Sequence, residues 1–317
     1  MKTDLQPLFD EFMRQQELIK RLRSETLRGY RQVFATFTKL MPEVTTPRAI
    51  VPANILEFYN KLQFRERLVG KRMIKTGIKN STVLTYRRKL GLFFEWLRIK
   101  EFIQKNPFSD MPLPKVDYED RRFLKKEDVN RILTAIISHH EKKPVAQKRD
   151  ILMFYILLFC GLRKKELILL ELRDVDTTRK NITVRGETSK SGKTRHIPLH
   201  SNIIDCFKDY LKERNDQKYK TPFLLVSGAS DNGLSVHGLK HWVERLKKIS
   251  GVKFHLHQFR HTFATNFLNS THTSNNIVKL KELMGHKDIS MTQVYLRGLS
   301  TDEMRADIEE MRIENLL

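Results

Sequence analysis

Apolar residues recur at steps of three and four through the first hundred residues, which is the spacing of one buried face of an α-helix. Ser24 could cap one helix, and Asn80 with Ser81 could cap another that runs to about Lys100. The pattern predicts four amphipathic helices, with apolar stripes at Leu8–Leu22, Leu27–Met41, Ile55–Leu62 and Val83–Leu97. The chain therefore begins with a small helical domain.

The pattern becomes mixed in the second part of the chain. Helices are expected at Lys126–Ile137, Asp150–Cys160 and Lys164–Leu170, and again from Gly238 onward. Between them, Asn181–Val184 and Arg195–Leu199 read as two strands, and the segment Lys190–Lys193 reads KSGK. This arrangement predicts a β-hairpin with a basic tip that contains glycine. The overall expectation is a mainly α protein with a small β-sheet.

A linker divides these two parts. Met111–Arg122, with the sequence MPLPKVDYEDRR, has two close prolines and many charges. We expect a helical domain over residues 1–110, a linker over 111–122 and a mixed α/β domain over 123–298. Residues 299–317 carry six acidic and two basic side chains, with apolar residues at helical spacing. They predict an amphipathic tail helix, which either packs on its own domain or docks on a neighbouring protomer.

The charge points to a polyanionic partner. The 317 residues include 59 Lys and Arg against 37 Asp and Glu, a formal net charge of +22, which favours nucleic acid over a membrane surface. Residues 1–115 hold 23 basic and 11 acidic side chains, so both parts of the chain are basic. DNA held between two basic domains fits this distribution better than one binding arm on a neutral enzyme.

Two basic segments of the helical domain are candidates for DNA contact. Phe64–Lys79 is either a solvated loop or a phosphate-contacting segment, because phosphate contacts need only Lys or Arg on a reachable surface. The candidate DNA-binding residues are Lys71 and Arg72 in this segment, and Arg87, Arg88 and Lys89 off the apolar stripe of the fourth helix.

Other features exclude several classes of protein. Cys160 and Cys206 lie in apolar helical contexts without metal-ligand spacing, so we expect reduced thiols, no metal site and a cytoplasmic location. The N-terminus lacks the apolar core of a signal peptide. Ile151–Leu162 is the most apolar run, and it is too short to span a bilayer.

The candidate chemistry is concentrated in Phe254–Arg297. This stretch contains His257, Arg260, His286 and Tyr295 in a strongly basic protein. Attack of a tyrosine on a DNA phosphodiester needs planar cations on the phosphate oxygens, a base for the phenol proton and an acid for the leaving 5′ oxygen. Because the phosphotyrosine bond conserves the phosphate energy, no cofactor is needed.

Four motifs, in order, match a known family. The chain reads GLRKKEL from Gly161, TSKSGKTRHIPL from Thr188, HQFRHTFAT from His257 and LMGHKDISMTQVY from Leu283. In this order and spacing it resembles the tyrosine recombinases of the phage-integrase family. The resemblance implies a helical core-binding domain, which includes the NPF sequence from Asn106 to Phe108. It also implies a mixed α/β catalytic domain, and the two domains would form a clamp around DNA.

The resemblance implies roles for the first two motifs. Arg163 is similar to the first catalytic arginine, and Arg260 resembles the second; together they would clamp the scissile phosphate. Lys190 matches the hairpin lysine that acts as general acid, although Lys193 is a competitor close by. Glu166 matches an acidic residue that supports the site by orienting side chains.

The other roles fall on the third and fourth motifs. Tyr295 is similar to the family nucleophile, and His286 takes the position of a residue that hydrogen-bonds the phosphate. His257 resembles the residue that accepts the tyrosine proton. His255 and His261 are its neighbours, but the spacing to the arginine selects His257, so we expect His261 to pack or to bond locally.

The implied function is site-specific DNA recombination through a 3′-phosphotyrosine intermediate and a Holliday junction. The partners implied are double-stranded DNA with inverted-repeat half-sites, three further copies of this chain in a tetramer, and in some systems an accessory protein. No room is expected for a separate arm-binding domain, which favours an Xer-like or small mobile-element integrase. The alternatives are a type IB topoisomerase and a non-catalytic DNA-binding regulator.

Overall fold

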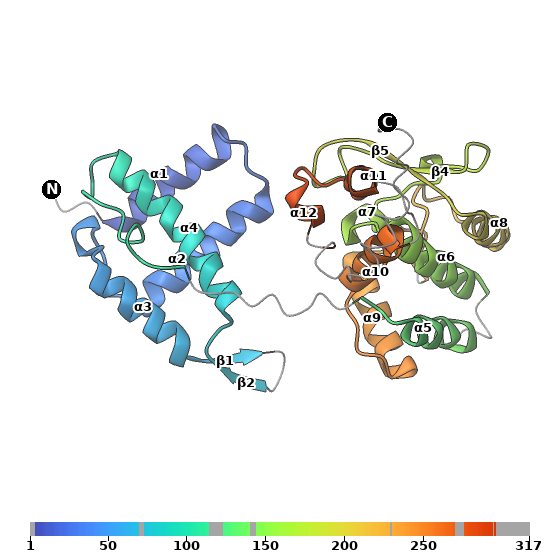
Figure 1. The fold of residues 1–317 in the computed structure, drawn as a ribbon, viewed down its shortest axis with the longest axis horizontal. Coiled ribbons are helices and arrows are strands. Elements are labelled where there is room, and N and C mark those ends of the chain that lie inside the picture. Colours follow the sequence, from blue (N-terminus) through green and yellow to red (C-terminus); the bar gives the residue numbers. More distant parts are fainter. Residues whose placement is uncertain are drawn as a thin grey trace, which may run out of the picture. The chain divides into compact units, whose positions relative to one another are not determined.

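The structure, a computed structural model, describes residues 4–69, 73–113, 123–139, 144–228, 230–269, 276–293 and 295. The chain divides into two compact units, Met1–Glu119 and Asp120–Leu317 (Figure 1). The amphipathic tail predicted over 299–317 lies outside the described residues, as does most of the predicted linker. No helix in the described part of the chain is long and apolar enough to cross a membrane.

The first unit consists of helices and one hairpin. The four predicted helices are α1 (Leu5–Leu18), α2 (Ser24–Leu40), α3 (Pro52–Phe64) and α4 (Asn80–Ile99), with a 3₁₀ turn at Pro47–Ala49. The caps predicted for α2 and α4 are wrong: Ser24, Asn80 and Ser81 lie inside the helices, whose N-cap residues are Arg23 and Lys79, and neither of these makes a side-chain cap bond. Pro52 begins α3, a position at which the backbone N–H makes no intrahelical bond, so proline is tolerated there.

An aromatic cluster holds these helices together. The rings of Phe9 and Phe34 stack with centroids 3.8 Å apart, and Phe93 meets them edge-on at 5.2 and 5.6 Å. The NPF sequence closes the unit, because Asn106 accepts a bond from the Phe108 backbone and donates one to the Gly91 carbonyl. This interior is built from the apolar stripes that the sequence pattern identified.

A β-hairpin occupies part of the basic segment between α3 and α4. Strands β1 (Glu66–Val69) and β2 (Met73–Thr76) pair antiparallel, with Leu68 opposite Ile74. The sequence predicted a charged loop or a phosphate-contacting segment here, and no strand. Leu68 and Ile74 are 67% and 64% exposed, so no core-facing alternation marked the strands.

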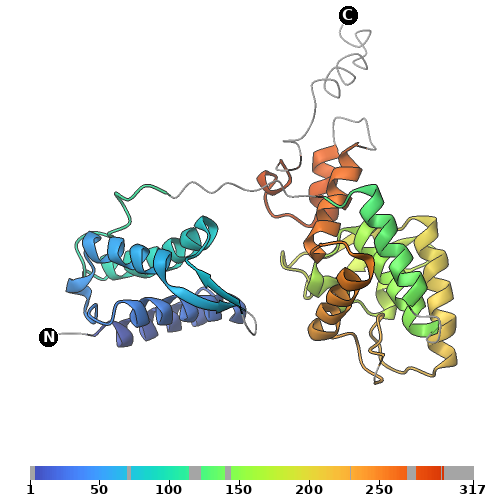
Figure 2. The same ribbon diagram turned by 90° about the horizontal axis from the view of Figure 1, so that it is seen from below.

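The second unit is built around the buried helix α6 (Pro144–Cys160). Its flanking helices are α5 (Lys126–His139), α8 (Ser201–Asp216) and α10 (Leu256–Asn269), as Figures 1 and 2 show. The side chains of Leu152, Met153 and Phe154 are fully buried, as expected for a helix covered on several sides. The remaining helices are α7 (Lys164–Ile168), α9 (Val236–Ser250), α11 (Asn276–Met284) and α12 (Ser290–Gln293).

A three-stranded antiparallel sheet completes this unit. It has the order β3 (Val175–Asp176), β4 (Asn181–Val184), β5 (Arg195–Pro198), and a 3₁₀ turn at Leu172–Asp174 precedes it. The predicted hairpin is confirmed in β4 and β5, while β3 was not predicted because it is only two residues long. The expectation of a mainly α protein with a small β-sheet is confirmed. Helix α11 packs against β5 and against α10, and thereby brings the start of the fourth motif to the sheet.

Candidate active site

The turn that follows α6 presents Arg163. Gly161 adopts φ +58°, which reverses the chain directly after the buried helix. An added Cβ at Gly161 would overlap the ring of Phe263 on α10, so the turn and that helix are in close contact. Arg163 precedes the short helix α7, and its backbone N–H donates to Glu166 Oε2 at 2.9 Å. The local sequence thus fixes the backbone from which the guanidinium extends.

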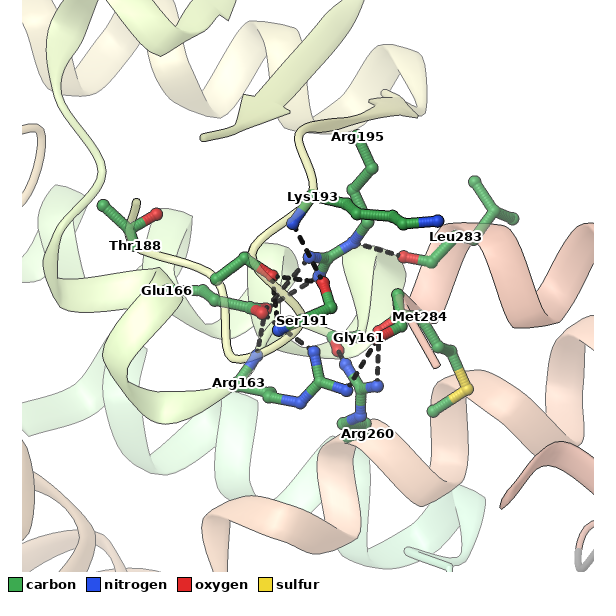
Figure 3. Close-up of polar contacts among 12 residues, drawn as sticks. Gly161, Arg163, Glu166, Thr188, Ser191, Lys193, Arg195, Arg260, Leu283 and Met284 are labelled. Carbon is green, nitrogen blue, oxygen red and sulfur yellow. Dashed lines mark hydrogen bonds and ion pairs between the residues drawn. The ribbon is translucent and has the colours of Figure 1, made fainter. Parts of the chain in front are cut away.

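Glu166 lies between two arginines (Figure 3). It accepts a bond from Arg163 Nη1 at 2.9 Å, and Arg195 bonds it with both terminal nitrogens, at 3.2 and 2.7 Å. Its side chain is 1% exposed, and burial alone would raise its pKa; the bonds and charges of Arg195 and Arg163 instead lower that pKa to about 2. Glu166 is therefore a carboxylate at neutral pH, and it bonds two arginine side chains at once.

Three arginines bond to three successive carbonyls at the end of α11. Leu283 accepts from Arg195 Nε at 2.7 Å, and Met284 accepts from Arg260 Nη2 at 2.6 Å (Figure 3). Gly285, at φ +62°, accepts from Arg163 Nη2 at 3.1 Å. A helix C-terminus leaves carbonyls without intrahelical partners and carries a partial negative charge, so it is suited to cations. This turn, Leu283–Gly285, leads directly into His286.

Arg260 is the most enclosed of these arginines. It is 2% exposed on α10, and its other terminal nitrogen, Nη1, donates to the Gly161 carbonyl at 2.6 Å. Burial, followed by the charge of Arg163, lowers its pKa to about 9, so it remains a cation at neutral pH. The two arginines assigned to the phosphate clamp therefore come together from segments almost a hundred residues apart.

His286 is held as a neutral ring. Burial and the charges of Arg260, Arg163 and Arg195 lower its pKa to about 4. Its Nδ1 lies 2.8 Å from the hydroxyl of Thr292, a fully buried residue on α12. That contact fixes the orientation of the ring and leaves Nε2 as the nitrogen able to meet a ligand.

The Tyr295 hydroxyl meets His261. Its oxygen is 3.0 Å from His261 Nδ1, so the expectation that His261 only packs or bonds locally is wrong. The helical spacing of four residues places the rings of His257 and His261 against each other, with centroids 4.4 Å apart. His257 is exposed and His261 is buried, so the buried member of the pair contacts the phenol.

Lys190 stands apart from this cluster. It is exposed in the β4–β5 connection, and within the described part of the chain no hydrogen bond or ion pair ties it to the arginines. Ser189 and Ser191 bond to each other on either side of it, with their hydroxyl oxygens 2.8 Å apart. The structure thus brings five of the six sequence-predicted residues to one region, while Lys190 is exposed in the β4–β5 connection.

The candidate DNA-binding residues differ from one another. Arg87 donates to the carbonyls of Phe108 and Pro112, each at 2.8 Å, and its guanidinium lies over the Phe108 ring. Lys89 lies over the Tyr30 ring, and burial lowers its pKa. Arg88 is exposed. Lys71 and Arg72 lie outside the described residues. Arg87 and Lys89 are therefore engaged within their own unit.

Arg195 was not among the residues predicted for the site. Its side chain is 8% exposed, and it alternates along β5 with Ile197, which is also buried. The alternation of side chains along the strand could have identified Arg195, because it places this residue on the same inward face as Ile197. No group of three or more His, Cys, Asp or Glu in the described residues could hold a metal ion.

The segment that contains these residues also matches a family model. The model of the phage integrase family matches residues 122–301, more than half of the chain. The chain belongs to the phage integrase family.

Individual members of the family align over most of the chain. It is 27% identical over 294 residues to tyrosine recombinase XerC of Psychromonas ingrahamii, which covers 92% of this chain and 91% of that protein. It is 32% identical over 245 residues to tyrosine recombinase XerA of Thermococcus kodakarensis, which covers 77% and 80%. The protein is thus a tyrosine recombinase, a DNA strand-transferring enzyme of site-specific recombination.

Solved structures of the family share the fold. The Tn1549 transposon integrase in complex with transposon right end DNA superposes with a TM-score of 0.75 at 20% identity, covering 98% of this chain and 99% of that one. A lambda integrase dimer bound to a COC′ core site gives 0.68 at 18%, covering 94% and 79%. At these identities the likeness concerns the fold of both units.

Proposed function

We propose that Tyr295 attacks the scissile phosphodiester of a DNA site, with Arg163 and Arg260 as the phosphate clamp. The Tyr295 oxygen forms a bond to phosphorus and the bond from phosphorus to the 5′ oxygen breaks. The products are a 3′-phosphotyrosine and a free 5′ hydroxyl. The observation that supports this most directly is the turn Leu283–Gly285, to which both arginines bond and which leads into His286.

In this proposal the phosphate binds to guanidinium N–H groups that remain after the arginine has bonded to backbone carbonyls. A guanidinium has five N–H groups, and within the described part of the chain Arg260 gives one bond to each of two backbone carbonyls. These carbonyl bonds fix the orientation of the fork in advance, so its remaining N–H groups can bond the phosphate oxygens without reorganisation as charge develops in the transition state. Arginine suits this role because its planar fork matches phosphate and stays charged.

Two proton transfers accompany the step. In this proposal the phenol proton passes to His257, with His261 holding the phenol oxygen in place before attack. Lys190 gives a proton to the departing 5′ oxygen once bound DNA lies against the β4–β5 connection. His286 donates from Nε2 to a phosphate oxygen while Thr292 orients the ring.

The partner in this proposal is duplex DNA with inverted-repeat half-sites. The net charge of +22 supports it, and Arg88, Lys71 and Arg72 are the remaining candidates for phosphate contact in the first unit. Four protomers on two duplexes would exchange strands when each 5′ hydroxyl attacks the phosphotyrosine of the other duplex. That exchange forms a Holliday junction, which a second round resolves. An Xer-like or small mobile-element integrase fits this scheme, with any accessory protein acting beside it.

A covalent-trapping experiment tests the nucleophile. On a labelled suicide substrate, where the cleaved 5′ fragment diffuses away, the wild type should accumulate a protein–DNA adduct and Tyr295→Phe should form none while binding DNA equally well. Tyr155→Phe is a matched control, because Tyr155 packs against Phe154 and Phe159 in the same unit. An adduct that persists in Tyr295→Phe would overturn the assignment.

A further inference from the structure

Arg195 connects the parts of the active site without occupying the place of a clamp residue. It begins β5, is 8% exposed, and bonds both Glu166 and the Leu283 carbonyl. Resting on the function proposed above, we infer that Arg195 is a positioning residue for strand cleavage. It acts by neutralising Glu166, which leaves a net positive charge at Arg163 for the phosphate, and by fixing the turn that leads into His286.

One reason is electrostatic. Glu166 is a buried carboxylate that needs a cationic partner, and Arg163 and Arg195 both bond to it. With Arg195 also bonded to the carboxylate, the two arginines and Glu166 together carry a net charge of +1, which attracts a phosphate at Arg163. Without Arg195, Glu166 would be paired by Arg163 alone. The guanidinium would then be drawn toward the carboxylate and its charge cancelled where the phosphate must bind.

A second reason is geometric. Arg195 Nε donates to Leu283 at 2.7 Å, which anchors the turn Leu283–Gly285 to strand β5. An added Cβ at Gly285 would lie 3.1 Å from Arg195 Nη1, so the turn approaches the guanidinium closely. The same strand ends the β4–β5 connection that carries Lys190. Arg195 therefore sets the positions of Arg163, His286 and the base of the Lys190 segment relative to one another.

Single-turnover cleavage on the suicide substrate, measured beside DNA binding, tests this inference. Arg195→Gln should bind DNA like the wild type and cleave about a hundredfold more slowly, the size of effect expected when a displaced support misplaces a reacting group. Arg195→Lys keeps the charge, but one ammonium cannot reach both Glu166 and Leu283. It should cleave more slowly than the wild type and faster than Arg195→Gln.

Arg185→Gln is the matched control. Arg185 also joins carboxylates to a backbone carbonyl in the same sheet region: it pairs with Glu171, Asp174 and Glu187 and donates to Leu169. It bonds neither Glu166 nor the turn Leu283–Gly285. Its loss should lower the unfolding temperature and leave the cleavage rate of the folded protein unchanged, which separates general destabilisation from positioning.

The double variant Glu166→Gln/Arg195→Gln provides a readout that a purely structural role would not give. Removing the carboxylate as well as its partner returns Arg163 its charge, so the double variant should cleave several-fold faster than Arg195→Gln. Wild-type cleavage by Arg195→Gln or Arg195→Lys, binding lost in parallel with cleavage, or a double variant no faster than the single one would each overturn the inference. If Arg195→Gln does not fold, the Arg195→Lys rate decides. Absence of an adduct in the wild type would instead contradict the proposed function.

Discussion

The Tyr295 hydroxyl oxygen lies 3.0 Å from Nδ1 of His261, one helical turn beyond the histidine that the motif spacing selects as its base. The imidazoles of His257 and His261 meet edge-to-face, with centroids 4.4 Å apart. A buried ring therefore contacts the phenol, and an exposed ring lies beside it. The two histidines can share the work of positioning the nucleophile and accepting its proton.

Substitution of each histidine separates these two tasks. His261→Gln should lower single-turnover cleavage by roughly fivefold, the effect of losing one hydrogen bond of about 1 kcal/mol. His257→Gln should lower it by about a hundredfold or more, as for removal of a general base. The measurement is the adduct formation rate at saturating DNA. A larger loss in His261→Gln would move the base assignment to His261.

Each clamp arginine should be needed for cleavage and dispensable for binding. Arg163→Ala and Arg260→Ala should each lower the cleavage rate by about a hundredfold or more, because a preorganised donor to the transition state is lost. Their affinity for DNA should stay near the wild-type value and fall steeply with added salt. Arg173→Ala, whose side chain is 71% exposed, is the control. Normal cleavage by either clamp variant would exclude its role.

The leaving group distinguishes Lys190 from Lys193. Lys190→Ala should cleave ordinary DNA about a hundredfold more slowly, because the 5′ oxygen then departs without an acid. A substrate with sulfur at the bridging 5′ position should restore the rate, since a thiolate leaves without protonation. Lys193→Ala should cleave both substrates like the wild type. If only Lys193→Ala were rescued by sulfur, Lys193 would be the acid.

The ring of His286 should resist protonation in DNA-free protein. Burial and nearby arginines lower its pKa from 6.5 to about 4, so the folded protein takes up this proton only at acidic pH. The unfolded chain takes up this proton near pH 6.5, so above that pH the protonation of His286 costs the folded state no stability. Stability is lost as the pH falls from about 6.5 toward about 4. An NMR titration of the ring checks this, with His286→Asn to assign the signal. A midpoint near 6.5 would contradict the prediction.

Two glycines with positive φ should differ in their tolerance of alanine. Gly161→Ala adds left-handed strain and an overlap with Phe263, whereas Gly192→Ala, at φ +77°, adds strain with no atom within 4 Å of the new Cβ. Strain alone costs about 1–2 kcal/mol, which lowers the unfolding temperature by roughly 2–4 °C per kcal/mol. Gly161→Ala should lower the unfolding temperature clearly more than Gly192→Ala does, and calorimetry measures the difference. Equal losses would show that α10 shifts freely.

Local patterns predicted most of the helices and the β4–β5 hairpin. The apolar stripe that includes Phe93 lies in the core, because a 3.6-residue period directly reports which face is buried. The hairpin β1–β2 was not predicted, because Leu68 and Ile74 face solvent and the described side chains of the strands have no alternation of buried and exposed residues. The two caps were predicted wrongly because the first residue of a helix depends on the backbone conformation of the residue before it, which residue type alone does not specify.

The sequence by itself determined which residues could do the chemistry. Arg163, Arg260, His286 and Tyr295 each lie in a short motif, and their order and spacing place the chain in its family. Only the tertiary structure showed that His261 meets the Tyr295 hydroxyl and that Arg195 joins Glu166 to the turn Leu283–Gly285. The reason is physical: a local pattern reports which face of an element is buried, whereas the partner of a buried charge is chosen by packing between distant segments.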